Sequence, residues 1–272
     1  MSIDVGRLLA LARKEVREYR RTPFVVGAMA VLPIVFMIAP LITIFAIGPS
    51  APAAPVGKAV GSTFLFLLIV PAVIPATIAA YSVVGEREQG TLEPLLTTPV
   101  RREEILLGKA LAAIVPAVTV AYVLFALVEI CAALFAGNPT VSTTLREGPH
   151  ILAEALFVPL LAMWSIGVGT GISARSSDVR VAQQLGTLAS VPPLAATFLV
   201  SYQIIPPSLW AAIGFGLGLL VLDIAMWRVV AAMFDRERLI TGSRAQGVAV
   251  SGGGAPPGQV RRIRAIGGDG GG

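Results

Sequence analysis

The sequence has few charged residues for its length. Only 14% of its 272 residues are charged, whereas 55% are hydrophobic. Soluble domains carry about 25% charged residues, so this chain cannot cover an ordinary water-facing surface. The mean hydropathy of +0.80 points the same way. The composition therefore excludes a soluble globular protein and predicts an integral membrane protein.

Cysteine, histidine and nucleotide-binding motifs are scarce or missing. The one cysteine, Cys131, lies inside an apolar run, so we expect neither a disulfide framework nor redox chemistry. The one histidine, His150, leaves no cluster that would hold a metal. "EILLGKAL" contains Gly-Lys but lacks the upstream glycine and the following Ser/Thr of a phosphate-binding loop. We therefore expect no ATP hydrolysis and no bound cofactor in this chain alone.

Long apolar runs divide the chain into expected membrane spans. A spanning helix needs roughly 20 mostly apolar residues. Such runs occur at about 24–47, 61–84, 105–136, 151–174, 184–203 and 209–231. The fifth run contains Pro192-Pro193, so we expect this span to be either broken or re-entrant. The expected fold is an all-α polytopic protein with six transmembrane helices in a domain over residues 24–233.

Lysine and arginine are distributed very unevenly between the connections. Nineteen of the 21 lie in residues 1–23, in 85–109, between the fourth and fifth spans, or from Arg228 onward. Only Lys58 and Arg146 fall in the other loops. The positive-inside rule then places both termini in the cytoplasm of a multi-pass protein of the plasma (inner) membrane. Topology and attraction to anionic headgroups account for the net charge of +5, so we expect no nucleic-acid partner.

The two termini have opposite characters. In residues 1–23 apolar side chains recur at helical spacing among arginines, which predicts an amphipathic helix lying in the membrane interface; they are Val5, Leu8, Leu9, Ala12, Val16 and Tyr19. Such a helix either serves only as an orientation anchor or has a functional role. Residues 234–272 end in a Gly/Pro-rich stretch with three arginines, and we expect a flexible cytoplasmic tail.

A compact charged insert separates the second and third apolar runs. Gly85 is suited to ending the second span. Thr91 is a good N-cap for a short helix, and Glu93 would lie in its first turn, where the helix dipole favours a negative charge. The pattern predicts a short cytoplasmic helix at about 86–104, with a well-capped solvated loop as the alternative. Lys109, early in the third span, would reach the headgroups with its ammonium group.

The stretch "GEREQGTLEPLLTTPVRREEILLGK" closely resembles the signature between the second and third spans of ABC-2-type transporter permeases. The matching positions are Glu86, Glu88, Gly90, Thr91, Leu92, Glu93, Leu95, Leu96, Thr98, Pro99, Arg101, Gly108 and Lys109. The resemblance implies that the insert is a coupling helix that docks on an ATP-binding subunit. It also implies that residues 1–23 form the family's connecting helix.

The same resemblance implies a function. The chain would be a permease subunit that forms a translocation pathway, paired with a second copy as a homodimer. A separate nucleotide-binding subunit would bind ATP and Mg, and export is the commoner direction in the family. The rival interpretation is a membrane anchor or assembly subunit that recruits an ATPase and transports nothing. An intramembrane enzyme is disfavoured, because the spans contain no His/Glu/Asp constellation or serine-based site.

Three acids lie at membrane depth and are candidate pathway residues: Asp223, Glu129 and Glu154. Carboxylates are costly there and usually face a cavity or a partner. Glu129 and Glu154 are close enough to the outer side to reach headgroup water, whereas Asp223 is deeper and suits a pathway or an inter-helix hydrogen bond. The pairs Gly167–Gly171 and Gly214–Gly218 favour close helix packing. The apolar composition mildly favours amphiphilic cargo.

Overall fold

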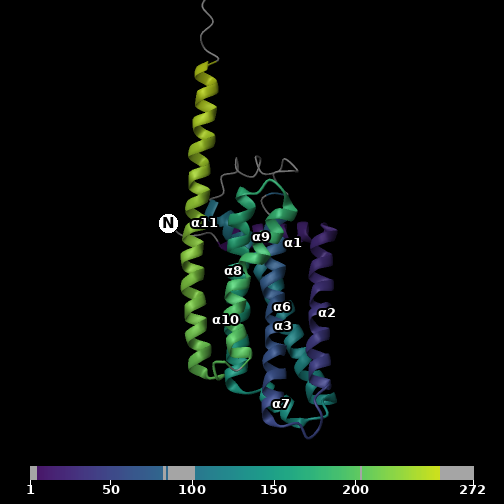
Figure 1. Ribbon diagram of the computed structural model, residues 1–272. Helices are drawn as coiled ribbons and strands as arrows, with labels where there is room; N and C mark the ends of the chain where they lie inside the picture. The colour runs from purple at the N-terminus through teal and green to yellow at the C-terminus, as the bar shows by residue number, and fades with distance from the viewer. Residues whose placement is uncertain (1–4, 82–83, 85–101, 203, 252–272) are drawn as a thin grey trace, which may run out of the picture. The chain divides into compact units, whose positions relative to one another are not determined.

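The computed structural model describes residues 5–81, 84, 102–202 and 204–251, and all regular structure in these ranges is helical (Figure 1). The helices are α1 (Val5–Tyr19), α2 (Pro23–Phe45), α3 (Ala53–Ala80), α6 (Arg102–Phe135), α7 (Pro139–Leu145), α8 (Gly148–Arg175), α9 (Val179–Ala189), α10 (Val191–Ser201) and α11 (Leu209–Ser251).

The chain divides into two units, residues 1–230 and 231–272, with the boundary inside α11. The helix bundle belongs to the first unit. Within it, α1 and α9 lie at one end, and α7 lies at the opposite end (Figure 1). These are called the α1 end and the α7 end below. The lysine and arginine distribution predicts that the α1 end is cytoplasmic.

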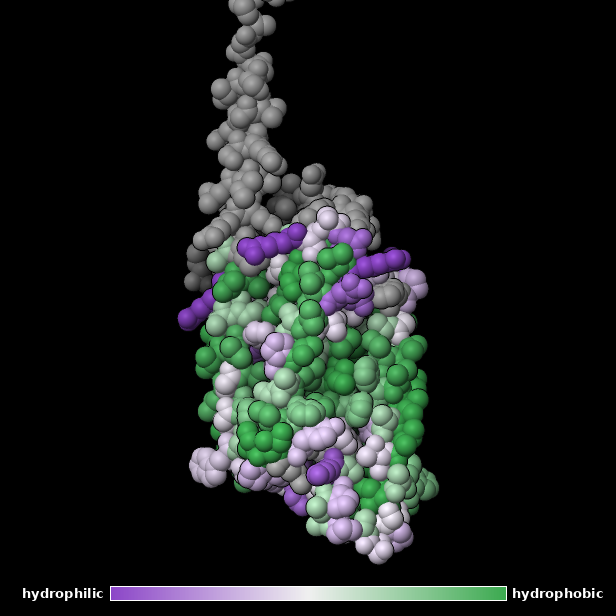
Figure 2. All heavy atoms as spheres, viewed as in Figure 1, coloured by the Kyte–Doolittle hydropathy of each residue, from purple (hydrophilic) through white to green (hydrophobic). Residues whose placement is uncertain are grey.

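Within the described ranges, five helices are long and apolar enough to cross a membrane. They are Val25–Phe45, Ala53–Ala80, Glu104–Phe135, Gly148–Arg175 and Leu209–Ala232. The prediction of an all-helical polytopic membrane protein is therefore confirmed in these coarse terms. On the face drawn in Figure 2, hydrophobic side chains form a broad band, and hydrophilic ones gather toward both ends. This is the distribution expected of a protein surrounded by lipid.

The second span begins earlier than predicted. α3 starts at Ala53, eight residues before the expected position, so Lys58 lies on the helix rather than in a loop. The apolar run starts near residue 61, but the small residues after Pro52 also adopt helical conformation. A hydropathy pattern marks where side chains are apolar and does not mark where a helix begins.

The expected fifth span is broken. α9 ends at Ala189 and α10 starts at Val191, with Ser190 between them. Prolines at the start of α10 explain the position, because proline lacks an N–H and is suited to the first turn of a helix. The two helices lead in turn from the α1 end toward the α7 end (Figure 1). Each has 11 residues, so neither alone has the length of a span. A sixth crossing made by both together stays a prediction.

The last helix is longer than predicted. α11 continues to Ser251, so residues 234–251 are helical where the sequence predicted the first part of a flexible tail. The reason is local: this stretch contains no proline, and the first proline after α11 is Pro256. Residues 252–272 of the predicted tail lie outside the described ranges.

The core of the bundle is built around α3. Of the most apolar 18-residue window of each spanning helix, 78% is buried in α3, against 17% in α2 and 22% in α11. α3 packs against α2, α6, α8, α9 and α10. Whatever moves α3 must therefore displace most of its neighbours, since tightly packed interiors transmit strain.

Candidate functional site

The predicted coupling residues Glu86, Glu88, Gly90, Thr91, Leu92, Glu93, Leu95, Leu96, Thr98, Pro99 and Arg101 lie outside the described ranges. The predicted end of the helix at 86–104 is wrong, because residues 102–104 already belong to the first turn of α6. What the structure describes is the two flanks of the insert, at the end of α3 and at the start of α6. Both flanks are fixed to other helices by named contacts.

The upstream flank is held by one serine of α8. The Ser173 hydroxyl donates a hydrogen bond to the Ala80 carbonyl at 3.0 Å and accepts one from the Val84 N–H at 3.2 Å. Ser173 is fully buried. Its hydroxyl thus satisfies backbone groups on either side of the end of α3, where the regular helical bonds run out. The chain that enters the insert is tied to α8.

The downstream flank is held by α1, which crosses α6 at Gly108 and Lys109. A methyl group added at Gly108 would lie 2.9 Å from the Leu11 Cβ, so only glycine permits this approach. The Lys109 Nζ lies 3.3 Å from the Glu15 Oε2, and both side chains are buried, at 9% and 3% exposed. These two contacts are called the α1–α6 clasp.

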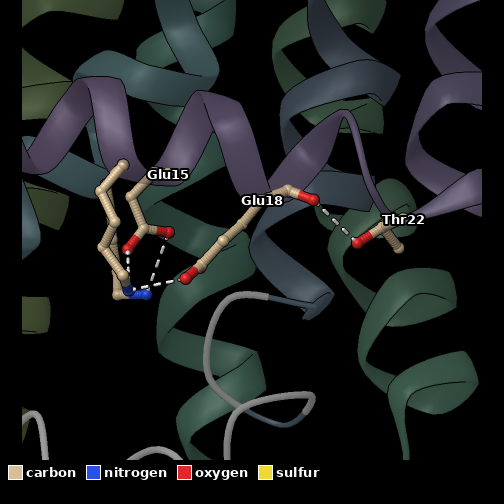
Figure 3. A network of polar contacts seen from close by, with 5 residues as sticks. Glu15, Glu18 and Thr22 are labelled. Carbon is tan, nitrogen blue, oxygen red and sulfur yellow. Dashed lines mark hydrogen bonds and ion pairs between the residues drawn. The ribbon is translucent and has the colours of Figure 1, made fainter.

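The clasp corrects one prediction. Lys109 does not reach the headgroups, because Glu15 meets its ammonium group inside the bundle. Around it, the exposed Lys14 contacts the Glu15 Oε1 at 3.4 Å and the Glu18 Oε1 at 3.0 Å (Figure 3). Just after α1, the hydroxyl of Thr22, the N-cap residue of α2, donates to the Glu18 carbonyl at 3.2 Å. Glycine and lysine at the end of the sequence motif thus serve to dock α1.

The surface of α1 carries two neighbouring apolar stripes. Leu8, Leu11 and Ala12 are partly buried on the same side as Glu15 and Tyr19. Val5, Leu9 and Val16 remain exposed on an adjacent side, at 64%, 50% and 39%. The predicted apolar face therefore divides between the bundle and the surroundings. The interfacial position of α1 stays a prediction, in which the exposed stripe would face lipid.

A polar seam joins α8, the α9–α10 break and α3. The Ser165 hydroxyl lies 2.7 Å from the Ser190 hydroxyl and donates to the Ala72 carbonyl. The Trp164 Nε1 donates to the Ala189 carbonyl at 2.9 Å. The break in the fifth run is thus held by side chains of α8. The sequence indicated the break through its prolines but gave no sign of these partners.

Small residues bring α8 close to α3 and to α11. A methyl group at Gly169 would lie 2.6 Å from the Ala79 Cβ, and one at Gly167 would lie 2.0 Å from the Met226 Cε. A methyl group at Gly216 would lie 3.3 Å from the Leu156 Cδ1. The predicted close packing is therefore confirmed at Gly167, and it also occurs at Gly169 and Gly216. Gly214 and Gly218 have no such neighbour among the described residues, so their predicted packing role is not seen there.

A groove of about 770 Å³ opens beside α9 near the α1 end. Its lining combines a guanidinium, amides and hydroxyls with aliphatic side chains: Tyr81, Arg180, Gln183, Gln184, Thr187, Leu188 and Val191. The polar residues recur at helical spacing along α9, which was the sequence signal for an amphipathic helix here. The groove is not predicted from the sequence, because residues 184–203 are interpreted there as one apolar run.

The three acids predicted at membrane depth lie in different surroundings. Glu129 is 25% exposed and pairs with Arg146, whose Nε lies 2.6 Å from the Glu129 Oε1. Glu154 is 2% exposed, so it does not reach headgroup water as predicted. Asp223 is 1% exposed. Within the described ranges neither Glu154 nor Asp223 has a hydrogen-bond partner for either carboxylate oxygen. The structure does not bring the three acids together into one site.

Comparison with known proteins adds two findings. The family model described as ABC-2 family transporter protein matches residues 9–204. The ABC transporter permease protein NatB of Bacillus subtilis (strain 168) is similar to this chain, at 32% identity over 145 residues. That match covers 51% of this chain and 37% of the relative. The family match contains the motif, the clasp from Leu11 onward, and the polar seam.

Proposed function

Because the chain belongs to the ABC-2 family of transporter proteins, we propose that it is the permease subunit of an ATP-driven exporter. The insert at 85–101 would be the coupling element that receives movement from a separate ATPase subunit, which binds ATP and Mg. Two copies of the chain would form the pathway as a homodimer. This places the energy source outside the chain, in agreement with its missing phosphate-binding loop.

One observation carries the proposal: both flanks of the insert are fixed to the bundle. On one side Ser173 ties the end of α3 to α8. On the other, Lys109 ties the start of α6 to Glu15 of α1. A displacement applied between these points reaches α3 at the centre of the bundle and α1 at its end. An ordinary solvated loop needs no such anchoring at both ends.

The groove beside α9 supports an amphiphilic cargo. It opens at the end predicted to be cytoplasmic, and it presents Arg180 together with amides and the aliphatic side chains of Leu188 and Val191. An anionic or polar head would find hydrogen-bond donors there, while an apolar part would contact the aliphatic side chains. Asp223, Glu154 and Glu129 are the candidate residues farther along the pathway.

The test substitutes the insert and measures coupling. We expect Thr91→Pro and Glu88→Ala to leave membrane insertion intact and to abolish transport. ATPase activity of the complex should fall to the level of the ATPase subunit alone. Thr143→Ala serves as the matched control, since Thr143 is an exposed threonine of α7 at the opposite end. Normal stimulated ATPase activity in both insert variants would contradict the coupling assignment.

The alternative function is a membrane anchor or assembly subunit that recruits an ATPase and transports nothing. Co-purification of an ATPase fits both functions, so it does not separate them. Turnover that rises when an amphiphilic substrate is added to the reconstituted complex separates them, because an anchor gives no such response. The groove supports the transporter, since the end of α3, α9 and the start of α10 together form a surface that could receive a substrate.

A further inference from the structure

Glu154 is a buried carboxyl group for which the described residues supply no counter-charge. Its side chain is 2% exposed, and among the described residues neither oxygen has a hydrogen-bond partner. An ionised carboxylate in this state would cost several kcal/mol. In this conformation Glu154 is therefore either protonated or neutralised by something it binds.

A line of titratable residues leads from Glu154 to the α7 end. Glu147, His150 and Glu154 follow one another at helical spacing around the start of α8, so their side chains share a face. Their exposure falls inward: the side chains of Glu147 and His150 are 54% and 12% exposed, and Glu154 is 2% exposed. The His150 Nδ1 lies 4.0 Å from the Glu147 Oε2. This Nδ1 is itself buried and has no hydrogen-bond partner in the described part of the chain.

The His150 ring is held in place by packing. It stacks on Phe64 of α3 with ring centroids 4.9 Å apart and an interplanar angle of 16°. Phe64 also packs against Phe125 of α6, at a centroid distance of 5.3 Å. The imidazole is thus fixed against Phe64 near the exposed Glu147, one helical turn before the buried Glu154. A histidine that served only in packing would not require acidic residues before and after it at helical spacing.

The elements packed against α8 bring no cation to Glu154. From α6, the Tyr122 hydroxyl donates to the Ala155 carbonyl at 3.0 Å. Glu129 and Arg146 neutralise each other at the rim. Lys58 of α3 is exposed and lines a separate hollow with Thr43 and Tyr202.

α11 meets α8 near Glu154 through Gly216, which packs on Leu156. The described residues of α11 before Asp223 include no titratable side chain. Asp223 follows Gly216 by seven residues, or about two helical turns. None of these groups forms an ion pair with Glu154.

A proton fits this site better than a metal ion does. The described residues contain no group of three His, Cys, Asp or Glu side chains that would hold a metal. A proton requires only one carboxyl oxygen and a route to water. We propose that Glu154 is a proton-binding site that exchanges with the α7 side of the membrane past His150 and Glu147. This proposal goes beyond ATP-driven transport and does not depend on it.

The exchange is a simple proton transfer. In the conformation described, the Glu154 carboxyl is neutral. When the α7 end of the bundle opens, water reaches Glu154. Hydration then lowers the free-energy cost of the negative charge on its carboxylate. The O–H bond of Glu154 breaks, and its proton joins the neutral imidazole of His150, giving an imidazolium beside the Glu147 carboxylate. The proton then leaves to water, and the imidazole is neutral again.

The experiment measures which carboxyls are protonated in apolar surroundings. Full-length protein in native membrane vesicles is treated with dicyclohexylcarbodiimide, which forms a stable adduct with neutral, buried carboxyl groups. Adducts on peptides containing Glu154 and Asp223 are quantified by mass spectrometry, with the pH varied on one side at a time. Alkylation of Thr143→Cys by an impermeant maleimide identifies the side that α7 faces, with the parent chain and its Cys131 as background.

We expect labelling of Glu154 to fall several-fold as the pH on the α7 side rises, and not to respond to the other side. Asp223, equally buried but without an exposed acid and histidine beside it, is the matched control, and its labelling should not follow the pH on the α7 side. His150→Phe keeps an aromatic ring against Phe64 and should slow the response of Glu154. Absence of labelling at every pH, or labelling that ignores the pH on the α7 side, would overturn the proposal.

Discussion

Two glutamates of this bundle are buried to nearly the same extent and have opposite surroundings. Glu15 is 3% exposed and Glu154 is 2% exposed. Glu15 has the Lys109 ammonium 3.3 Å from one oxygen, whereas Glu154 has no partner in the described part of the chain. Equal burial therefore goes with different surroundings, and the presence of a partner distinguishes the two acids.

The largest loss of stability is expected from breaking the ion pair between Glu15 and Lys109. Lys109→Ala removes the buried cation of Glu15 and leaves it only the half-exposed Lys14 at 3.4 Å. Loss of one partner of a buried pair costs about 3–5 kcal/mol. We expect a strong loss of folded protein, seen as a lower thermal unfolding midpoint and aggregation on size-exclusion chromatography in detergent.

The double variant Glu15→Met with Lys109→Met is the control for this loss. It removes both charges and should be close to neutral or stabilising, because neither charge is then left buried. If the single and double variants were equally damaged, the loss would come from packing at the α1–α6 crossing and not from the ion pair.

A change in stability of the opposite sign is expected when Glu154 is replaced. Glu154→Leu removes a carboxyl group with two unpartnered oxygens, and each buried unsatisfied group costs about 1–3 kcal/mol. We expect a higher thermal unfolding midpoint than that of the parent chain in the same detergent. A lower midpoint would mean that Glu154 has a stabilising partner in the membrane, and its contrast with Glu15 would disappear.

The smallest change in stability is expected from replacing Lys14, the second lysine beside Glu15. Lys14 also contacts Glu15, but its side chain is 45% exposed, and its other partner Glu18 is 49% exposed. Exposed pairs at this spacing contribute about 0.3–0.5 kcal/mol. Lys14→Ala should therefore shift the unfolding midpoint barely above experimental error. A loss as large as that of Lys109→Ala would show that exposure does not separate the two lysines.

The sequence predicted the membrane spans more reliably than their ends. Runs of apolar residues located α2, α3, α6, α8 and the first part of α11, because length and hydropathy are local properties. The start of α3 and the extent of α11 differed, since helix formation continues beyond the apolar residues. Pro192-Pro193 correctly indicated the break, whose position at Ser190 depends on the first turn of α10.

Contacts between distant segments were beyond prediction from the sequence. The motif pointed to Gly108 and Lys109, yet it could not show that Leu11 and Glu15 would meet them. Glu154 and Asp223 were recognised by type and depth, whereas the absence of partners follows only from packing. The groove beside α9 was missed, because it requires a broken helix and the end of α3 together.

The α1–α6 clasp also has a consequence for biosynthesis. Its two charged members are 94 residues apart in the chain, and a ribosome adding about 5–20 residues per second needs roughly 5–20 seconds to make that stretch. During this interval α1 has been synthesised and its docking partner has not. Its exposed apolar stripe, with Val5, Leu9 and Val16, would allow α1 to bind the membrane surface until α6 is available. Docking of α1 becomes possible only once Lys109 has been made, so α1 reaches its final contacts when synthesis of the third span has begun.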